Sequence, residues 1–161
     1  QKYLTMEDMK IISDMIIPAA WYPLDTFRRA GNAVFELFGE SDPEAAKQWG
    51  REMVERIPDQ MFKSFFDKQD PQKGVMNYVN VNARLLDFMR IRAAELSERS
   101  VTIAFHGEPA VLAAFPELPL LALIIAGAAE RVAIKNGATA AESRLAPHSR
   151  QGLAAVEVSW K

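Results

Sequence analysis

Two histidines are the first side chains to consider for chemistry in this 161-residue chain, because imidazole serves both acid–base catalysis and metal binding. His106 ends an alternating stretch that predicts a strand, and His148 lies in a predicted turn. The two could meet across neighbouring hairpins, but two imidazoles alone make a poor metal site. We therefore predict a surface or sheet-edge role for both, rather than catalysis or metal binding.

The other reactive groups do not form a pattern that catalysis would need. Ser143, Ser149 and Ser159 lack the strand–turn–helix setting of a serine nucleophile. Most carboxylates occupy first turns of predicted helices or lie beside basic residues, as on solvated helix faces. Glu130-Arg131 differs, because it interrupts an otherwise apolar helix: the pair marks the point where the helix emerges into water, which we favour, or it lines a cavity. The chain is not expected to be an enzyme.

Composition excludes several further classes. There is no cysteine, so disulfides, thiolate metal sites and cysteine nucleophiles are ruled out, and we expect no metal and no cofactor. The net charge is −2 and the basic residues are dispersed, so nucleic acid is not an expected partner. The apolar run over residues 118–129 is too short for a membrane span. No signal peptide is recognised, and a cytoplasmic location is expected.

Aromatic and methionine side chains are concentrated in the predicted helical half, and most are expected in the core. Some could line an apolar pocket between helices and sheet, where small-ligand sites commonly form. The candidates for this ligand pocket are Trp21, Tyr22, Phe62, Phe66 and Phe105. Amphipathic helices with apolar surface left over could equally form a homodimer or docking face.

Helical signals dominate the first half of the chain. Residues 6–17 have helical periodicity, and Pro23 and Gly39 mark the start and end of the next helix. Asp42-Pro43 and Asp70-Pro71 each pair an N-cap with a proline at the first helical position. The three asparagines after Asp70 predict fraying near Val81. The helix that begins at Pro43 is expected to bury a stripe made of Ala46, Trp49, Met53 and Ile57.

After these helices the apolar residues recur at every second position. Residues 89–93 and 101–106 alternate, which predicts a hairpin with a loop of about four residues. An apolar helix over residues 118–136 needs cover on most sides, and a terminal hairpin in residues 138–161 is the natural candidate. The fold class is therefore α+β: a helical half packed on an antiparallel sheet made of two hairpins, with the long apolar helix between them. Residues 1–161 are expected to form a single domain, and Gln1 in place of Met is expected of a chain trimmed at its N-terminus.

Two motifs add a family resemblance. Trp21-Tyr22-Pro23-Leu24 and the closing Glu157-Val158-Ser159-Trp160 resemble the two ends of a domain found mainly in myxobacterial proteins of unknown function. That domain is similar to 4-vinyl-reductase sensor domains and, more distantly, to haem nitric-oxide-binding and TRAPP-type folds. The family's cysteines are absent, since Ala154 stands where one is usual, and the Y-x-S-x-R motif of the haem relatives is also missing. The resemblance thus implies the scaffold without its metal or haem ligands.

The leading functional prediction is a non-enzymatic regulatory module that dimerises or docks a protein partner in signalling. It rests on an intact scaffold sequence without clustered polar chemistry. The alternative is a sensor domain that holds a small apolar ligand between helices and sheet, and it rests on the aromatic candidates named above.

Overall fold

The computed structural model describes residues 3–14, 21–58, 60, 69–107, 118–146 and 154–161. Its helices are α1 (Met6–Ser13), α2 (Leu24–Phe38), α3 (Pro43–Glu55), α5 (Pro71–Leu85) and α7 (Leu118–Lys135). Its strands are β1 (Arg90–Ser97), β2 (Ser100–His106), β3 (Ala141–Leu145) and β4 (Ala154–Trp160). The chain forms two compact units, Gln1–Ala45 and Ala46–Lys161, and that the whole is one domain stays a prediction.

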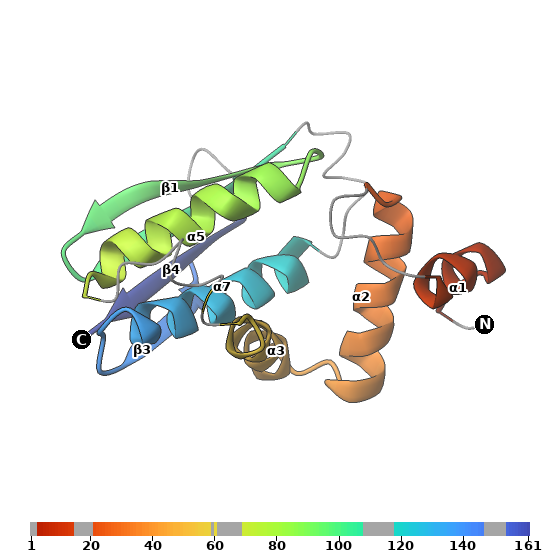
Figure 1. The fold of residues 1–161 in the computed structure, drawn as a ribbon, viewed down its shortest axis with the longest axis horizontal. Coiled ribbons are helices and arrows are strands. Elements are labelled where there is room, and N and C mark those ends of the chain that lie inside the picture. The colour runs from red at the N-terminus through yellow and green to blue at the C-terminus, as the bar shows by residue number, and fades with distance from the viewer. Residues whose placement is uncertain (1–2, 15–20, 59, 61–68, 108–117, 147–153) are drawn as a thin grey trace. The chain divides into compact units, whose positions relative to one another are not determined.

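The C-terminal unit confirms the predicted α+β class. Its strands form one antiparallel sheet in the order β1-β2-β4-β3, so each predicted hairpin supplies one central and one edge strand. Helices α5 and α7 pack against one face of this sheet (Figure 1). The buried side chains of that face come from β2, β4 and α7: Val101, Ile103, Phe105, Val156, Val158, Ile125, Ala129 and Val132.

Local signals set the ends of most elements where the sequence predicts them. Asp70 accepts a hydrogen bond from the Lys73 amide at 2.9 Å and starts α5. Gly137 adopts a left-handed φ of 108° just after α7, a conformation that glycine tolerates best. The predicted fraying near Val81 is wrong, because α5 continues to Leu85. Asn82 donates to the carbonyl of Tyr78 at 3.0 Å, so its amide does not draw the main chain out of the helix.

Helices α3 and α7 cross with their main chains in contact. A Cβ atom at Gly50 would collide with the carbonyl oxygen of Ile124, and one at Gly127 would collide with the carbonyl of Lys47. The two glycines therefore face each other's helices, and the axes approach as closely as backbone permits. Larger side chains at either position would force the helices apart.

This crossing corrects the predicted stripe of α3. The buried positions are Ala46, Gly50 and Val54, four residues apart, whereas Met53 is 51% exposed. The sequence suggests a stripe through the largest apolar side chains. The helix instead turns its smallest residues toward α7, because close backbone contact excludes bulk there.

The N-terminal unit is held by a carboxylate rather than by an apolar stripe. Asp8 on α1 is completely buried, while the apolar Met9 and Ile12 of the same helix are exposed. Arg29 of α2 donates from Nε to Asp8 Oδ2 at 2.7 Å and from Nη2 to Oδ1 at 2.8 Å. Thr26 Oγ1 donates to Oδ1 at 2.7 Å, and the amide and hydroxyl of Thr5 both donate to Oδ2 at 2.8 Å. Five donors thus enclose one carboxylate.

We predict that Gly50→Ala lowers the free energy of unfolding by about 3 kcal/mol, because the added methyl would meet the main chain of α7. Gly31→Ala on α2 is the matched control, since a Cβ there meets nothing within 4 Å and alanine favours a helix over glycine by about 0.5–1 kcal/mol. Urea denaturation followed by circular dichroism measures both. Equal midpoints for the two variants would mean that the helices can separate without loss.

A second prediction concerns acid. The hydrogen bonds from Arg29, opposed by burial, hold the pKa of Asp8 well below its usual range. Its unfolded pKa is about 3.9, so the stabilising contribution is complete above that pH and declines as the pH falls toward the folded value. The protection of the α1 amides, measured as their exchange rate relative to an unstructured peptide at the same pH, should therefore decrease below about pH 4.

The control for this acid effect is Asp8→Asn, which keeps the shape of the side chain and removes its charge. In that variant the amide hydrogens of α1 should exchange faster at neutral pH, and their protection should lose most of its dependence on acid. An unchanged pH profile in Asp8→Asn would assign the acid sensitivity to other carboxylates.

Candidate functional site

The five aromatic candidates for a ligand pocket have different surroundings. Trp21 and Tyr22 precede α2 in the N-terminal unit and are 67% and 39% exposed. Phe105 on β2 belongs to the C-terminal unit and is completely buried among the side chains of the helix-covered face. Phe62 and Phe66 lie outside the described residues. A pocket formed by these residues together therefore stays a prediction.

His106 is the last residue of the central strand β2 and is partly exposed. Its Nε2 accepts a hydrogen bond from Nε of Arg92 at 3.1 Å, on the neighbouring strand β1. Its partial exposure agrees with the surface role that the sequence predicts for this residue, whereas His148 falls outside the described residues. Among the described residues, no group of three or more His, Asp or Glu side chains has the arrangement of a metal site.

The most concentrated polar chemistry in the C-terminal unit surrounds Glu130 on α7. This side chain is only 2% exposed. Its Oε2 accepts from Nε of Arg51 on α3 at 2.7 Å and lies 2.6 Å from Nη2 of the same residue. Its Oε1 accepts from Oγ of Ser143 on β3 at 2.5 Å and lies 3.9 Å from Nζ of Lys47. One carboxylate therefore ties α3, α7 and β3 together.

The expectation that Glu130-Arg131 marks emergence into water is wrong for Glu130. The glutamate turns inward, where two cations and a hydroxyl replace its hydration. Arg131 lies at the margin and pairs with Glu55 of α3, which Lys135 also approaches at 3.5 Å. Burial works to raise the pKa of Glu55, but the ion pairs with Arg131 and Lys135 outweigh it and lower that pKa.

Sequence reasoning missed the partners of Glu130, although one signal was available. A lone acid inside an apolar helix needs a cation from elsewhere when it is buried. Lys47 and Arg51 are four residues apart, so they share one face of α3 and could have been nominated as a pair. Both carboxylate oxygens of Glu130 already have donors. We therefore expect this side chain to hold α3, α7 and β3 together rather than to transfer a proton to a substrate.

The fold given by these elements is that of H-NOX domains. A structure described as probing the function of heme distortion in the H-NOX family aligns with 96% of this chain and 83% of its own, with a TM-score of 0.63 and 15% identity. An oxygen complex of an oxygen-binding H-NOX domain related to soluble guanylate cyclases gives a TM-score of 0.61 at 14% identity over 96% and 84% of the two chains. A structure described as giving insights into the molecular mechanism of H-NOX activation gives a TM-score of 0.60 at 15% identity over 96% and 84%.

At these identities the comparison establishes the fold alone. No family model matches the chain, so the resemblance to the 4-vinyl-reductase-like family is not confirmed by a family match. No curated protein matches either. Among helices in the described ranges, none has both the length and the apolar character that crossing a membrane requires.

A haem held by a histidine or a cysteine does not fit the described residues. The chain has no cysteine, and His106, the described imidazole, is partly exposed at the end of β2 and is engaged by Arg92. The other side-chain classes that ligate haem iron, thioethers and phenols, are present among the described residues, for example in Met89 and Tyr78.

We predict that Glu130→Ala destabilises the domain by about 3 kcal/mol, because it leaves the cations of Lys47 and Arg51 facing each other at a partly buried crossing. Arg51→Met, which leaves the buried carboxylate with one fewer cation, should cost a similar amount. The double variant should cost clearly less than the sum, since it removes both charges. Urea denaturation of all three variants measures this coupling.

Arg56→Ala is the control for these variants, because Arg56 is highly exposed and its pair with Glu52, at 3.8 Å, is well solvated. It should change stability by less than about 0.5 kcal/mol. If the stability lost in the double variant equalled the sum of the two single losses, Glu130 and Arg51 would not be energetically coupled.

Proposed function

We propose that this chain is a non-enzymatic sensor domain that binds a small apolar ligand. The observation that carries the proposal is the likeness of its fold, over almost the whole chain, to domains described in terms of heme and oxygen binding. The ligand proposed here is apolar and not held by an iron–histidine or iron–cysteine bond, because the chain has no cysteine and the described histidine is engaged by Arg92. Such a domain would convert occupancy into a change that a partner protein reads.

The aromatic pair before α2 is the proposed point of ligand contact. Trp21 is mostly exposed and Tyr22 is partly so, and side chains of this kind offer a large apolar area with a polar tip. Phe105 can contribute only if the core opens around it, since it has no exposed surface. Phe62 and Phe66 remain candidates from the sequence.

Protein docking or homodimerisation is the second candidate. It is favoured by the apolar side chains that the N-terminal unit exposes, which include Met6 and Met9 on α1 and Phe27 and Leu37 on α2. Exposed apolar surface of this extent is typical of surfaces that associate. The two candidates are compatible, because a sensor domain needs a partner to report to.

The test is native mass spectrometry of the purified domain, followed by titration with a panel of small aliphatic and aromatic ligands monitored by tryptophan fluorescence. We expect a monomer with added mass, or saturable binding of at least one ligand class. Trp21→Ala should weaken that binding about tenfold or more, because burial of an aromatic side chain against a ligand contributes more than about 1.4 kcal/mol. Met53→Ala, an exposed apolar position outside the candidate set, should leave it unchanged.

The other outcomes decide between the two functions. A ligand-free dimer would favour docking, and interface mapping would then begin at Met6 and Met9. Ligand-free protein that binds no member of the panel would reject the sensor proposal. Binding with equal affinity in Trp21→Ala and Met53→Ala would reject the proposed contact site.

A further inference from the structure

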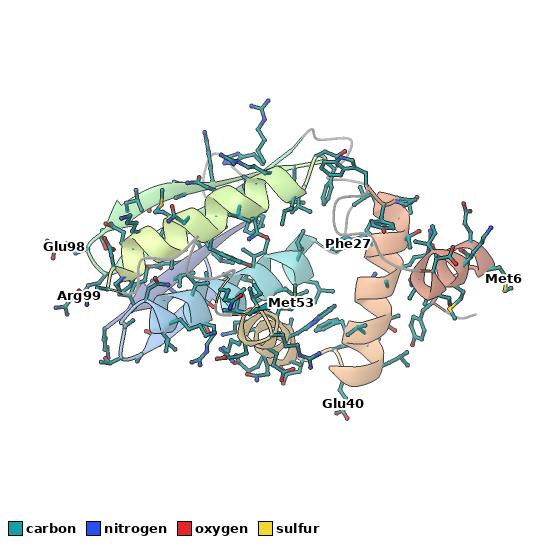
Figure 2. All side chains as sticks on the ribbon, viewed as in Figure 1. Met6, Phe27, Glu40, Met53, Glu98 and Arg99 are labelled. Carbon is teal, nitrogen blue, oxygen red and sulfur yellow. The ribbon has the colours of Figure 1, made fainter. Side chains whose placement is uncertain are left out.

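A polar groove opens at one end of the sheet, and none of the aromatic candidates described above lines it. It has a volume of about 460 Å³. Its walls come from the turn between β1 and β2, the start of β3 and the end of β4. Figure 1 places that turn at the same end of the sheet as the C-terminus, and Figure 2 shows Glu98 and Arg99 projecting from it.

The floor of the groove is a row of hydroxyl groups that crosses the sheet. Ser97 pairs with Ser100, Ser100 with Ser159, and Ser159 with Glu142, so one register row runs over all four strands. The hydroxyls of Ser97 and Ser100 are hydrogen-bonded to each other at 2.8 Å. These side chains share the sheet face opposite α5 and α7, because residues paired in register point to the same side.

Charges of both signs line the groove. Arg99 supplies a cation from the turn before β2, Lys161 supplies one just after β4, and Glu142 supplies a carboxylate on the edge strand β3. None of these three forms an ion pair with a described residue. Glu157 also lines the groove, but Arg144 already neutralises it with contacts of 2.7 and 2.9 Å. Within the described part of the chain, the groove thus offers a free positive end and a free negative end.

The main chain holds both ends in place. The carbonyl of Arg99 accepts from the Trp160 amide at 2.9 Å, which fixes the turn to β4. The Lys161 amide donates to the Ala140 carbonyl at 3.0 Å, and its own carbonyl accepts from the Thr139 amide at 2.6 Å. A site whose backbone is already fixed loses little conformational freedom when a ligand binds.

From this arrangement we infer that the groove binds a short zwitterionic peptide. Its carboxylate lies at Arg99, its ammonium lies at Glu142, and its main chain crosses the serine row. Arg99 directly precedes β2, and β2 and β3 are separated by two strand spacings, about 10 Å. An extended tripeptide also spans about 10 Å between its charged ends, whereas a single amino acid cannot reach both.

This inference is independent of the proposed apolar ligand, because it uses other residues and another chemistry. The probe is triglycine, which carries both charges and no side chains. Titration into ¹⁵N-labelled protein should shift the amide signals of Ser100, Glu142 and Ser159 in a saturable way. Glycine at the same concentration should shift them much less.

Testing each protein variant with a modified peptide identifies which residue contacts which end of the peptide. Arg99→Ala should weaken triglycine about threefold to tenfold and leave triglycinamide, which lacks the carboxylate, unaffected. Glu142→Gln should weaken triglycine by a similar factor and leave N-acetyltriglycine, which lacks the ammonium, unaffected. Arg56→Ala is the control, since Arg56 is an exposed arginine that does not line the groove.

Two results would overturn the inference. One is the absence of saturable shifts at the groove amides with triglycine at roughly 10 mM, which is weaker than any useful recognition. The other is binding that ignores both Arg99→Ala and Glu142→Gln. Unchanged amide spectra of the free variants would show that each keeps its fold.

Discussion

The C-terminal unit depends on the contact between the main chains of α3 and α7. Gly50 and Gly127 let the two helices touch, and this closeness determines which face of α3 is buried. It also brings Lys47 and Arg51 to Glu130, which would be costly to bury without cations beside it. The Ser143 hydroxyl extends the same carboxylate contact to the edge strand. Close backbone packing and neutralisation of the buried carboxylate therefore occur at the same helix crossing.

Local sequence signals predicted the elements well, because their causes are local. Caps such as Asp70, prolines at first helical positions and alternating strand residues act over a few neighbours, and the structure confirms the elements that they indicate. The errors arose where distant partners decide the outcome. Met53 is displaced from the core by a glycine contact with α7, and Asp8 is buried by an arginine on another helix. The residue pattern within a single helix does not reveal a partner that lies on another helix.

The candidate sites, like the helices and strands, could not be predicted where distant residues decide the outcome. The aromatic ligand candidates were chosen by residue type, which cannot distinguish a core phenylalanine such as Phe105 from an exposed aromatic such as Trp21. The Glu130 cluster and the serine row require knowledge of helix crossing and strand register, which one sequence does not supply. The fold itself is shared with domains described in terms of heme and oxygen binding, yet this chain has no cysteine and its described histidine is engaged by Arg92. One scaffold can thus carry sites of quite different chemistry.

The strand order β1-β2-β4-β3 has a consequence for how the protein is made. The strand β4 follows every other described element in the sequence, but it occupies a central position and pairs with both β2 and β3. During synthesis on the ribosome, the inner edge of β2 therefore remains without its neighbour until β4 has been translated. Helices α5 and α7 are available earlier and can shield the apolar face of the first hairpin meanwhile. Nascent chains of this fold should be most vulnerable to misassembly in that interval, when a chaperone would be of most use.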